Sequence, residues 1–445
     1  MFSRKDLMKI LLPLFVEQLL AVTIGMLDSM MVSSAGEAAV SGVSLVDSIN
    51  VLLSNVFVAL ATGGSVVCSQ LLGRKDYLEA RASAKQLIHT GFYISLLILA
   101  VALLFRMQIL RLIFGSVSAS VMANASIYFL FTSLSYPFLA LYNSGAAIFR
   151  AMGNSKISMK VSVFMNLLNV CGNALLIFGF HLGAAGAAIA TLFSRIVGSV
   201  LMISLLYNKN NSIYIEKLFS YRPDFRLIRR ILHIGVPNGM ENGMFQFGKL
   251  LTQSLISTFG TAAIAANAVS NVIASFVYAA GGSFGIVMIT VVGRCVGAGE
   301  EKQAKQYAKK LIGIEYLFIL VVTLILTAFA GLIIRGYDIS DTALAWKLIL
   351  IHNVASILIW PLAFTLPYCF RAASDVTFSL VVSVCSMWTF RVALSYVLAR
   401  YFNVGAECVW IAMIVDWIFR TTMFVLRFIS DKWFLSYRKT LEQNS

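Results

Sequence analysis

Two acidic residues interrupt the first long apolar segment of the chain. Glu17 and Asp28 lie within residues 8–33, a run that is otherwise largely hydrophobic. Their separation corresponds to about three turns of an α-helix, so we expect both side chains on nearly one face, roughly 16 Å apart along the axis. Either carboxyl group could exchange a proton or, when ionised, provide an oxygen ligand for a small cation. Because a charge at the centre of a bilayer costs roughly 2.5–3.5 kcal/mol, such residues usually face a cavity or a partner.

The segment around Glu17 has a second copy in the other half of the chain. PLFVEQLLAVTIGMLD at 13–28 aligns with PNGMENGMFQFGKLLT at 237–252, so that Glu17 matches Glu241. The second copy carries a polar stripe at helical spacing, which indicates a helix face turned towards a cavity. The stripe comprises Asn238, Asn242, Lys249 and Gln253, with Glu241 and Gln246 beside it. We predict a substrate cavity lined by Glu17, Glu241, Asn242, Gln246 and Lys249.

Further charged residues lie in apolar runs near the end of each half. Asp416 stands one helical turn before Arg420, and this order of acid and base suits a pair within one helix. Arg195 and Arg391 are other possible partners. Paired charges inside a membrane can be purely architectural, so we interpret Arg195, Arg391, Asp416 and Arg420 as a structural charge network.

The elements that must position these residues are membrane-spanning helices. Of the 445 residues, 59% are hydrophobic and only 12% are charged, whereas a soluble protein would carry about twice that charged fraction. Twelve apolar runs are each long enough to cross a bilayer, which needs about 20 residues. They are 8–33, 45–72, 86–106, 121–146, 157–179, 183–207, 232–258, 266–294, 310–334, 345–370, 377–399 and 404–429. The runs lack the alternation of barrel strands, so the sequence predicts an all-α polytopic membrane protein.

The repeat extends over most of both halves. Residues 33–48 align with 257–272, which places Gly36 over Gly260, and Pro137 aligns with Pro361. FRAMGN at 149–154 aligns with FRAASD at 370–375. Six spans in each half give both halves the same orientation, related by a pseudo-twofold axis along the membrane normal. We expect two six-helix bundles, an N-terminal lobe at 1–207 and a C-terminal lobe at 231–445, joined by a flexible loop at 208–230.

The net charge of +15 could suit a nucleic-acid partner, but its distribution indicates membrane topology instead. Most of the 35 Lys and Arg residues fall in loops and helix ends on the side of the N-terminus. By the positive-inside rule this predicts that both termini lie in the cytoplasm, with the chain in a bacterial-type plasma membrane. We therefore expect the lipid bilayer as a partner, no nucleic acid, and a monomer.

Sequence features of enzymes are missing. The chain has no HExxH or GxSxG motif, its four histidines are scattered, and its six cysteines include no CxxC pair. We expect no enzymatic activity and no cofactor. The only metal site that the residues suggest is a Na⁺ site at Asp28.

Several motifs together resemble the multidrug and toxic compound extrusion (MATE) transporters. They are GMLDSMMVSSAG, GVPNGMENGMFQFGKL, FRAMGNS, FRAASD, NALLIFGFHLGAAGAAIAT and VWIAMIVDWIFR. The resemblance implies twelve helices in two lobes and export of organic cations in exchange for Na⁺ or H⁺. It further implies that Asp28 binds the coupling cation, with Asn169, Asn173 and Thr191 completing the site. Some members carry a second acid where this chain has Asn173, which leaves one clear acid here.

Two classes of transporter remain open at this point. The leading hypothesis is a secondary antiporter that works by alternating access. The alternative is a flippase for lipid-linked saccharides, from the same superfamily, which would need a cationic lumen to hold pyrophosphate. The expected lumen residues are mainly acids and amides with the single base Lys249, which argues against the flippase. Neither a catalytic cluster nor a sensory domain supports a membrane enzyme or a receptor.

Overall fold

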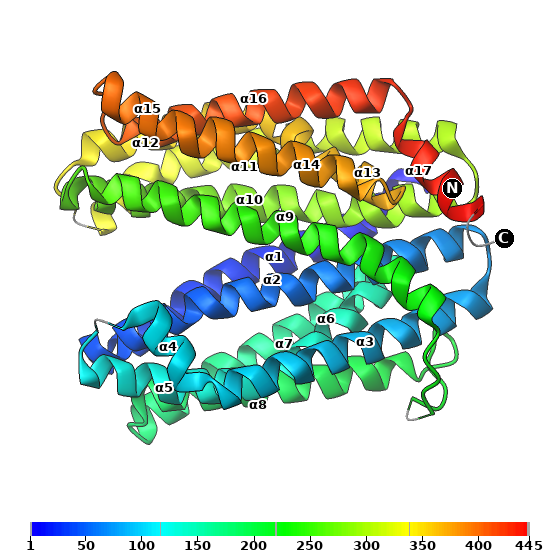
Figure 1. The fold of residues 1–445 in the computed structure, drawn as a ribbon, viewed down its shortest axis with the longest axis horizontal. Coiled ribbons are helices and arrows are strands. Elements are labelled where there is room, and N and C mark those ends of the chain that lie inside the picture. The colour runs from blue at the N-terminus through cyan, green and yellow to red at the C-terminus, as the bar shows by residue number, and fades with distance from the viewer. Residues whose placement is uncertain (1, 116, 219, 338, 443–445) are drawn as a thin grey trace. The chain divides into compact units, whose positions relative to one another are not determined.

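The computed structural model describes residues 2–115, 117–218, 220–337 and 339–442. For residues 439–442 it describes the backbone alone. All regular structure in this part of the chain is helical, and no strand occurs in it. The chain forms two compact units (Figure 1). The N-terminal unit is Arg4–Gly239, and the C-terminal unit is Met240–Ser445 together with Met1–Ser3.

The N-terminal unit is built from helices that follow one another along the chain. They are α1 (Arg4–Ser33), α2 (Glu37–Gly73), α3 (Tyr77–Leu104), α4 (Arg106–Phe114), α5 (Ala119–Leu134), α6 (Tyr136–Ala151), α7 (Ser155–Asn173), the π-helical turn η1 (Ala174–Gly179) and α8 (Gly183–Leu206).

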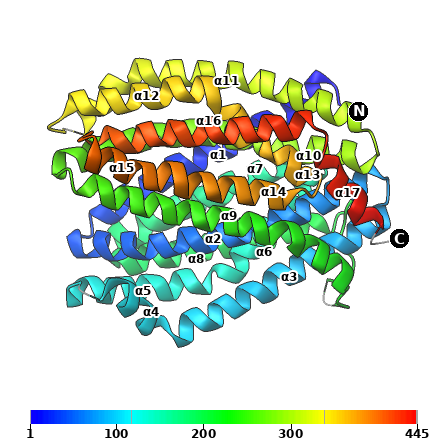
Figure 2. The same ribbon diagram turned by 45° about the horizontal axis from the view of Figure 1, so that its top comes forward.

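The C-terminal unit repeats this order with more irregular spans. Its helices are α9 (Phe225–Ser257), which begins in the N-terminal unit, α10 (Thr261–Gly297), α11 (Glu301–Gly336), α12 (Thr342–Trp360), the π-helical turn η2 (Pro361–Thr365), α13 (Pro367–Ala372), α14 (Val376–Ser386), the π-helical turn η3 (Met387–Ala393), α15 (Leu394–Tyr401), α16 (Glu407–Ile429) and α17 (Trp433–Glu442). Figure 2 shows α9 to α16 running alongside one another within this unit.

The helices have the length and hydropathy of membrane spans. Ten stretches of the described chain qualify as single spans, and α5 with α6, bent by 45°, makes an eleventh. α9, which is 33 residues long and carries the polar stripe, is not among these eleven; it covers all but the last residue of the predicted span at 232–258. The prediction of an all-α polytopic membrane protein with two six-helix bundles is confirmed.

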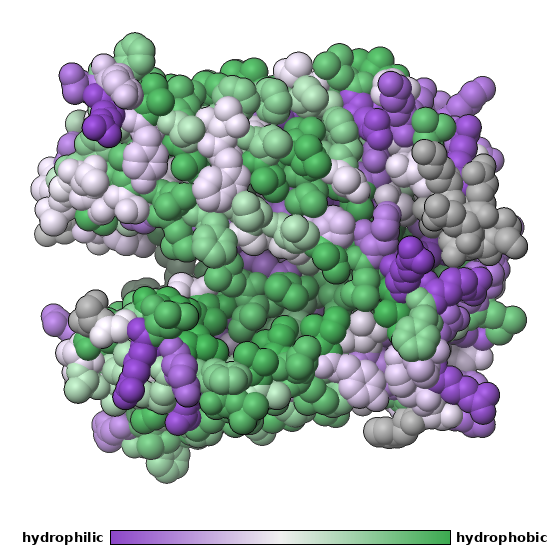
Figure 3. Space-filling model, in the orientation of Figure 1, coloured by the Kyte–Doolittle hydropathy of each residue, from purple (hydrophilic) through white to green (hydrophobic). Residues whose placement is uncertain are grey.

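The distribution of buried residues fits helices that pack inwards and face lipid outwards. In their most hydrophobic windows α2 and α10 are 56% and 67% buried, so each is a central helix of its unit. The corresponding window of α11 is only 22% buried, and Leu317, Leu324 and Leu332 are exposed along that helix. Figure 3 shows apolar side chains over the middle of the helices and hydrophilic ones towards the helix ends. Rows of exposed leucines on a spanning helix indicate contact with the apolar part of a bilayer.

The internal repeat is visible in the backbone. Gly36 and Gly260 precede α2 and α10 with the same φ of +96°, a conformation that residues with a Cβ rarely adopt. Pro137 lies in the first turn of α6, and Pro361 opens η2. Proline lacks the N–H that a helix interior requires and clashes with the preceding turn. The fourth span of each unit is therefore irregular at the matched proline.

The division between the two units falls inside α9, between Gly239 and Met240. From the sequence we expected the division between the two units earlier, in a linker at 208–230. The reason for the difference is that the start of α9 packs closely against α2. A Cβ on Gly63 would lie 2.5 Å from the carbonyl oxygen of Ile231. Glycine permits this close approach of two backbones, so the first turns of α9 belong to the N-terminal unit.

The segment between α8 and α9 is held by α3. Lys85 Nζ donates to the carbonyl oxygen of Lys217 at 2.8 Å, and Gln86 Nε2 donates to that of Arg222 at 2.7 Å. Arg81, on the preceding turn of α3, binds the same segment. The loop that was expected to be flexible is therefore fastened along much of its length.

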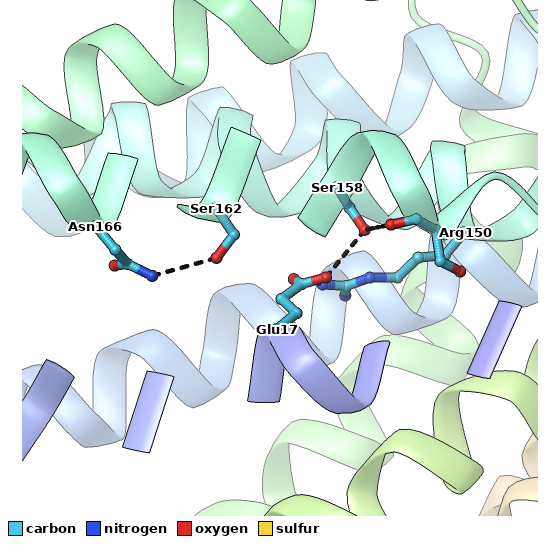
Figure 4. A network of polar contacts seen from close by, with 6 residues as sticks. Glu17, Arg150, Ser158, Ser162 and Asn166 are labelled. Atoms are coloured by element: carbon cyan, nitrogen blue, oxygen red, sulfur yellow. Dashed lines mark hydrogen bonds and ion pairs between the residues drawn. The ribbon is translucent and has the colours of Figure 1, made fainter. Parts of the chain in front are cut away.

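Glu17 forms a buried ion pair with Arg150 at the end of α6 (Figure 4). Its second carboxylate oxygen accepts a hydrogen bond from the Ser158 hydroxyl of α7 at 3.0 Å. The Glu17 and Arg150 side chains are 7% and 17% exposed. One carboxylate thus links α1 to both α6 and α7, and this face of α1 also carries Asp28.

The second copy of the repeat contains the same ion pair. Glu241 accepts from Arg371 of α13 at 2.8 Å, and the two side chains are 12% and 8% exposed. Arg150 and Arg371 occupy the same place in FRAMGN and FRAASD. Each matched glutamate therefore has a matched arginine, and the pair belongs to the architecture of both bundles.

We predict that Glu17→Gln and Arg150→Gln each destabilise the protein by on the order of 3–5 kcal/mol, because each leaves a buried charge without its counter-charge. The double variant should lose much less than the sum of the two. A double-mutant cycle measured by unfolding of the purified protein in detergent checks this. The exposed pair Lys209 and Glu216 is the control, with an expected coupling below about 1 kcal/mol. An equally small coupling at Glu17 and Arg150 would contradict the structural role.

We further predict that Gly63→Ala destabilises the protein by about 1–3 kcal/mol, because the new methyl group meets backbone atoms of α9 that cannot move aside. Gly313→Ala on α11 is the matched control, since a Cβ there meets nothing within 4 Å. It should leave stability unchanged or raise it by up to about 1 kcal/mol through helix propensity. Thermal unfolding of both variants distinguishes the two cases, and equal melting temperatures would refute the close-packing argument.

Candidate functional site

The residues predicted for the cation site lie together within the N-terminal unit. Asn173 Nδ2 of α7 donates to Asp28 Oδ1 at 2.7 Å. The side-chain amide of Asn169 lies 3.0 Å from both oxygens of Asp28 and 3.2 Å from the Thr191 hydroxyl of α8, so it can donate to the acid and accept from the threonine. The structure thus brings together Asp28, Asn169, Asn173 and Thr191, the four residues that the resemblance implied.

A second acid, which was not among the predicted site residues, lies close to this cluster. Asp47 of α2 accepts hydrogen bonds from the Tyr128 hydroxyl and the Asn50 amide, both at 3.1 Å. Its charge acts on Asp28. The predicted span began at residue 45, which left Asp47 close to its start. α2 actually begins at Glu37, which places Asp47 well inside it.

Arg195 belongs to this acidic cluster and not to the network predicted for it. Its guanidinium donates to the Ser135 hydroxyl at 2.6 Å and interacts electrostatically with Asp28 and Asp47. The predicted network grouped it with Arg391, Asp416 and Arg420, but those residues lie in the C-terminal unit. The sequence could not separate these possibilities because spacing along the chain does not reveal which helices pack together.

The chemistry of the cluster suits a small cation or a proton. Two carboxylates and one arginine leave an excess of negative charge among half-buried and buried groups. Asn173 is 1% exposed, and its side-chain oxygen Oδ1 has no hydrogen-bond partner within the described chain. A buried acceptor without a donor, next to a carboxylate, is an available ligand position. The helix also turns into the π-helical η1 directly after Asn173, a distortion frequent at functional sites.

The C-terminal unit encloses a cavity of about 320 Å³. The polar stripe of α9 forms one wall, with Glu241, Asn242, Gln246 and Lys249 on it, as predicted. Aromatic rings form much of the remainder. Trp360 stacks on Tyr278 and Phe364 with ring centroids 4.7 and 4.1 Å apart. The cavity is therefore a pocket of ligand-binding size with an apolar, aromatic body and a charged wall.

Two of the basic side chains at this cavity, Arg371 and Arg420, are neutralised by direct ion pairs. Arg371 pairs with Glu241, as described above, and Arg420 Nε donates to Asp416 Oδ1 at 2.8 Å. Asp416 also accepts from the Ser386 hydroxyl. The predicted pair of Asp416 and Arg420 is therefore present, and both residues are almost completely buried.

Two other bases on the cavity wall have no carboxylate of their own. Lys249 forms no ion pair with any described residue, and the charge that acts on it is that of Arg391. Arg391 is 7% exposed, and the acid that acts on it is Asp416, which is already bound to Arg420. The lining contains four bases, Lys249, Arg371, Arg391 and Arg420, and the single acid Glu241. The expectation that Lys249 would be the only base among acids and amides was wrong.

Glu17 is placed differently from the other predicted cavity residues. It lies in the N-terminal unit, bound to Arg150 and Ser158, whereas Glu241 reaches the cavity of the C-terminal unit and pairs with Arg371. Arg150 and Arg371 lie just beyond the predicted spans 121–146 and 345–370, so their apolar runs gave no sign of these contacts. Their recurrence in FRAMGN and FRAASD, at the offset of the repeat, was the signal that could have identified them as partners of the two glutamates.

Comparisons with known proteins agree with this architecture. The chain is 25% identical to a probable multidrug resistance protein NorM of Thermotoga maritima, over 97% of this chain and 93% of that protein. It is 27% identical to the multidrug export protein MepA of Staphylococcus aureus, over 60% of this chain and 58% of that one. The fold matches a crystal structure of a MATE protein in complex with MaD3S with a TM-score of 0.88, at 18% identity, over 98% and 97% of the two chains. The MatE family model matches residues 13–175 and 237–397, one stretch in each repeat. The chain therefore belongs to the MatE family of multidrug and toxic compound extrusion transporters.

Proposed function

We propose that this protein is a secondary antiporter that exports small organic molecules, drugs among them, in exchange for Na⁺ or H⁺. The observation that carries the proposal is the acidic cluster at Asp28, where Asn169, Asn173 and Thr191 surround a half-buried carboxylate. The names of the NorM and MepA relatives support multidrug export. The family resemblance implies organic cations as substrates. The basic loops support a plasma-membrane location with both termini in the cytoplasm.

Coupling would arise because the Asp28 cluster binds its cation in one arrangement of the transporter and releases it in the other. For Na⁺, the carboxylate of Asp28 and the free carbonyl oxygen of Asn173 supply ligands. For H⁺, protonation of Asp28 removes the charge that Asn173 and Asn169 stabilise. Entry of either ion is driven partly by the membrane potential, about 2.3 kcal/mol per charge per 100 mV.

A flippase for lipid-linked saccharides is a second candidate, and one observation favours keeping it. It would need cationic groups to hold pyrophosphate, and the C-terminal cavity carries three arginines besides Lys249. Growth of a flippase-deficient strain that expresses this chain would support the flippase. Failure to restore growth, with the protein present in the membrane, would leave the antiporter as the function.

We predict that Asp28→Asn abolishes drug efflux while the protein still folds, because the amide keeps the shape and one acceptor oxygen but can neither ionise nor take up a proton. Efflux from cells and unfolding of the purified variant are the two measurements. Glu37→Gln at the exposed start of α2 is the control and should transport normally. Full efflux by Asp28→Asn would remove the mechanism.

We also predict that an imposed ion gradient alone drives substrate uptake or release in proteoliposomes. Separate Na⁺ and pH gradients should give transport with one of the two ions and not with the other, and the active gradient identifies the coupling ion. The Asp28→Asn protein should respond to neither. Equal substrate flux with and without any gradient would show that the chain is not an antiporter.

A further inference from the structure

The cavity of the C-terminal unit holds more positive charge than its own acids neutralise. Glu241 and Asp416 are each engaged with one arginine, Arg371 and Arg420. Lys249 and Arg391 line the same cavity without a carboxylate of their own in the described chain. A buried charge without a counter-charge is costly, so these two bases need either water or a ligand of opposite charge.

Hydrogen-bond donors on this cavity wall also lack acceptors. Arg391 Nε, Trp360 Nε1 and Trp417 Nε1 are buried and have no partner among the described residues. All three residues line the cavity, and their side chains are at most 8% exposed. Guanidinium and indole groups can only donate. Any ligand group that pairs with them must therefore be an acceptor, such as a carboxylate, sulfonate or phosphate oxygen.

The repeat shows that this polarity is particular to the second copy. Thr252 occupies the place of Asp28, and Asn271 occupies the place of Asp47, so both acids of the N-terminal cluster are absent. Lys249 stands where the first copy has Gly25. The two units thus use the same helices to build sites of opposite charge.

The remaining wall suits an apolar, flat molecule. Tyr278, Trp360, Phe364 and Trp417 form a continuous group of rings with centroids 4.1 to 5.4 Å apart between neighbours. A volume of about 320 Å³ is at the lower end of the range for sites of small organic ligands. Lys249, Tyr278 and Arg391 also line a smaller adjoining cavity, so the two bases stand where the pockets meet.

We propose that the cavity of the C-terminal unit is a binding site for an organic anion, whose charged group contacts Lys249 and Arg391 and whose apolar body packs against the rings of Tyr278, Trp360 and Phe364. The paired arginines, Arg371 and Arg420, remain bound to their acids and hold the wall in place. This assignment goes beyond the antiport proposed above and does not depend on it, because binding requires no ion gradient.

The test is equilibrium binding to the full-length protein in lipid nanodiscs, without any gradient, measured by calorimetry and by quenching of tryptophan fluorescence. Three ligands share one ring system and differ in charge: 2-naphthoate, 2-naphthylmethanol and 2-naphthylmethylammonium. We expect 2-naphthoate to bind roughly tenfold or more tightly than the other two, as charge-assisted hydrogen bonds require. Farnesyl diphosphate is the fourth ligand: displacement of 2-naphthoate by it would identify a lipid diphosphate as one source of the anion, and no displacement would restrict the site to free aromatic anions.

Variants of the two unpaired bases give the decisive comparison. Lys249→Gln and Arg391→Gln should each remove most of the preference for 2-naphthoate over the neutral alcohol, whereas Arg391→Lys should keep much of it. The controls Lys309→Gln and Arg400→Gln remove exposed bases of the same unit and should bind like the unaltered protein. If either Gln variant does not fold, the ligand series on the unaltered protein still decides. Equal or tighter binding of the ammonium compound, or an anion preference that survives both substitutions, would overturn the proposal.

Discussion

The cost of leaving a charge alone in an apolar medium governs how this chain is built. Few ionisable side chains lie within the spanning helices, and several of them form ion pairs with a side chain of opposite charge. Glu17 pairs with Arg150 and Glu241 pairs with Arg371, each across two helices, whereas Asp416 pairs with Arg420 one turn further along α16. Such pairs contribute little net stability compared with a well-packed apolar contact, but they are strongly destabilising when half of the pair is lost.

Against that background the unmatched groups stand out. In the N-terminal unit two acids share one arginine, and in the C-terminal unit two bases have no acid left to pair with. Both excesses occur next to buried polar atoms that lack a partner, the carbonyl oxygen of Asn173 in one case and the N–H groups around Trp360 in the other. The two repeats thus share the same Glu–Arg ion pair. They differ in the charge of the remaining site, which is negative in the N-terminal unit and positive in the C-terminal unit.

The sequence predicts the spans and the repeat well because both depend on local properties. Apolar runs reveal helices that must satisfy their backbone in lipid, and matched glycines and prolines keep their backbone roles in both copies, as Gly36 and Gly260 do. The stripe on α9 also identifies its cavity-facing side, since helical periodicity alone decides which residues share a face. Asp28 stands out as an acid within an apolar run, whereas Asn169, Asn173 and Thr191 came from the family resemblance alone.

What the sequence does not predict depends on contacts between distant segments. Arg195 could be assigned to either charge cluster until the packing of α8 against α5 was known, and Arg371 seemed to lie outside the cavity because its span was taken to end before it. Asp47 was overlooked because a helix can begin well before its apolar run does. Each error concerns the partner of a charged residue, which only the tertiary structure specifies.

The attachment to α3 fixes the segment between α8 and α9 within the N-terminal unit. A flexible loop of this length would let the helices at its two ends move independently. Here Lys85 and Gln86 bind the backbone at Lys217 and Arg222. Only a few residues then separate the contact at Arg222 from the start of α9 at Phe225. The start of α9 and the first turns of α3 are therefore held close together, so we expect a displacement of one to act on the other.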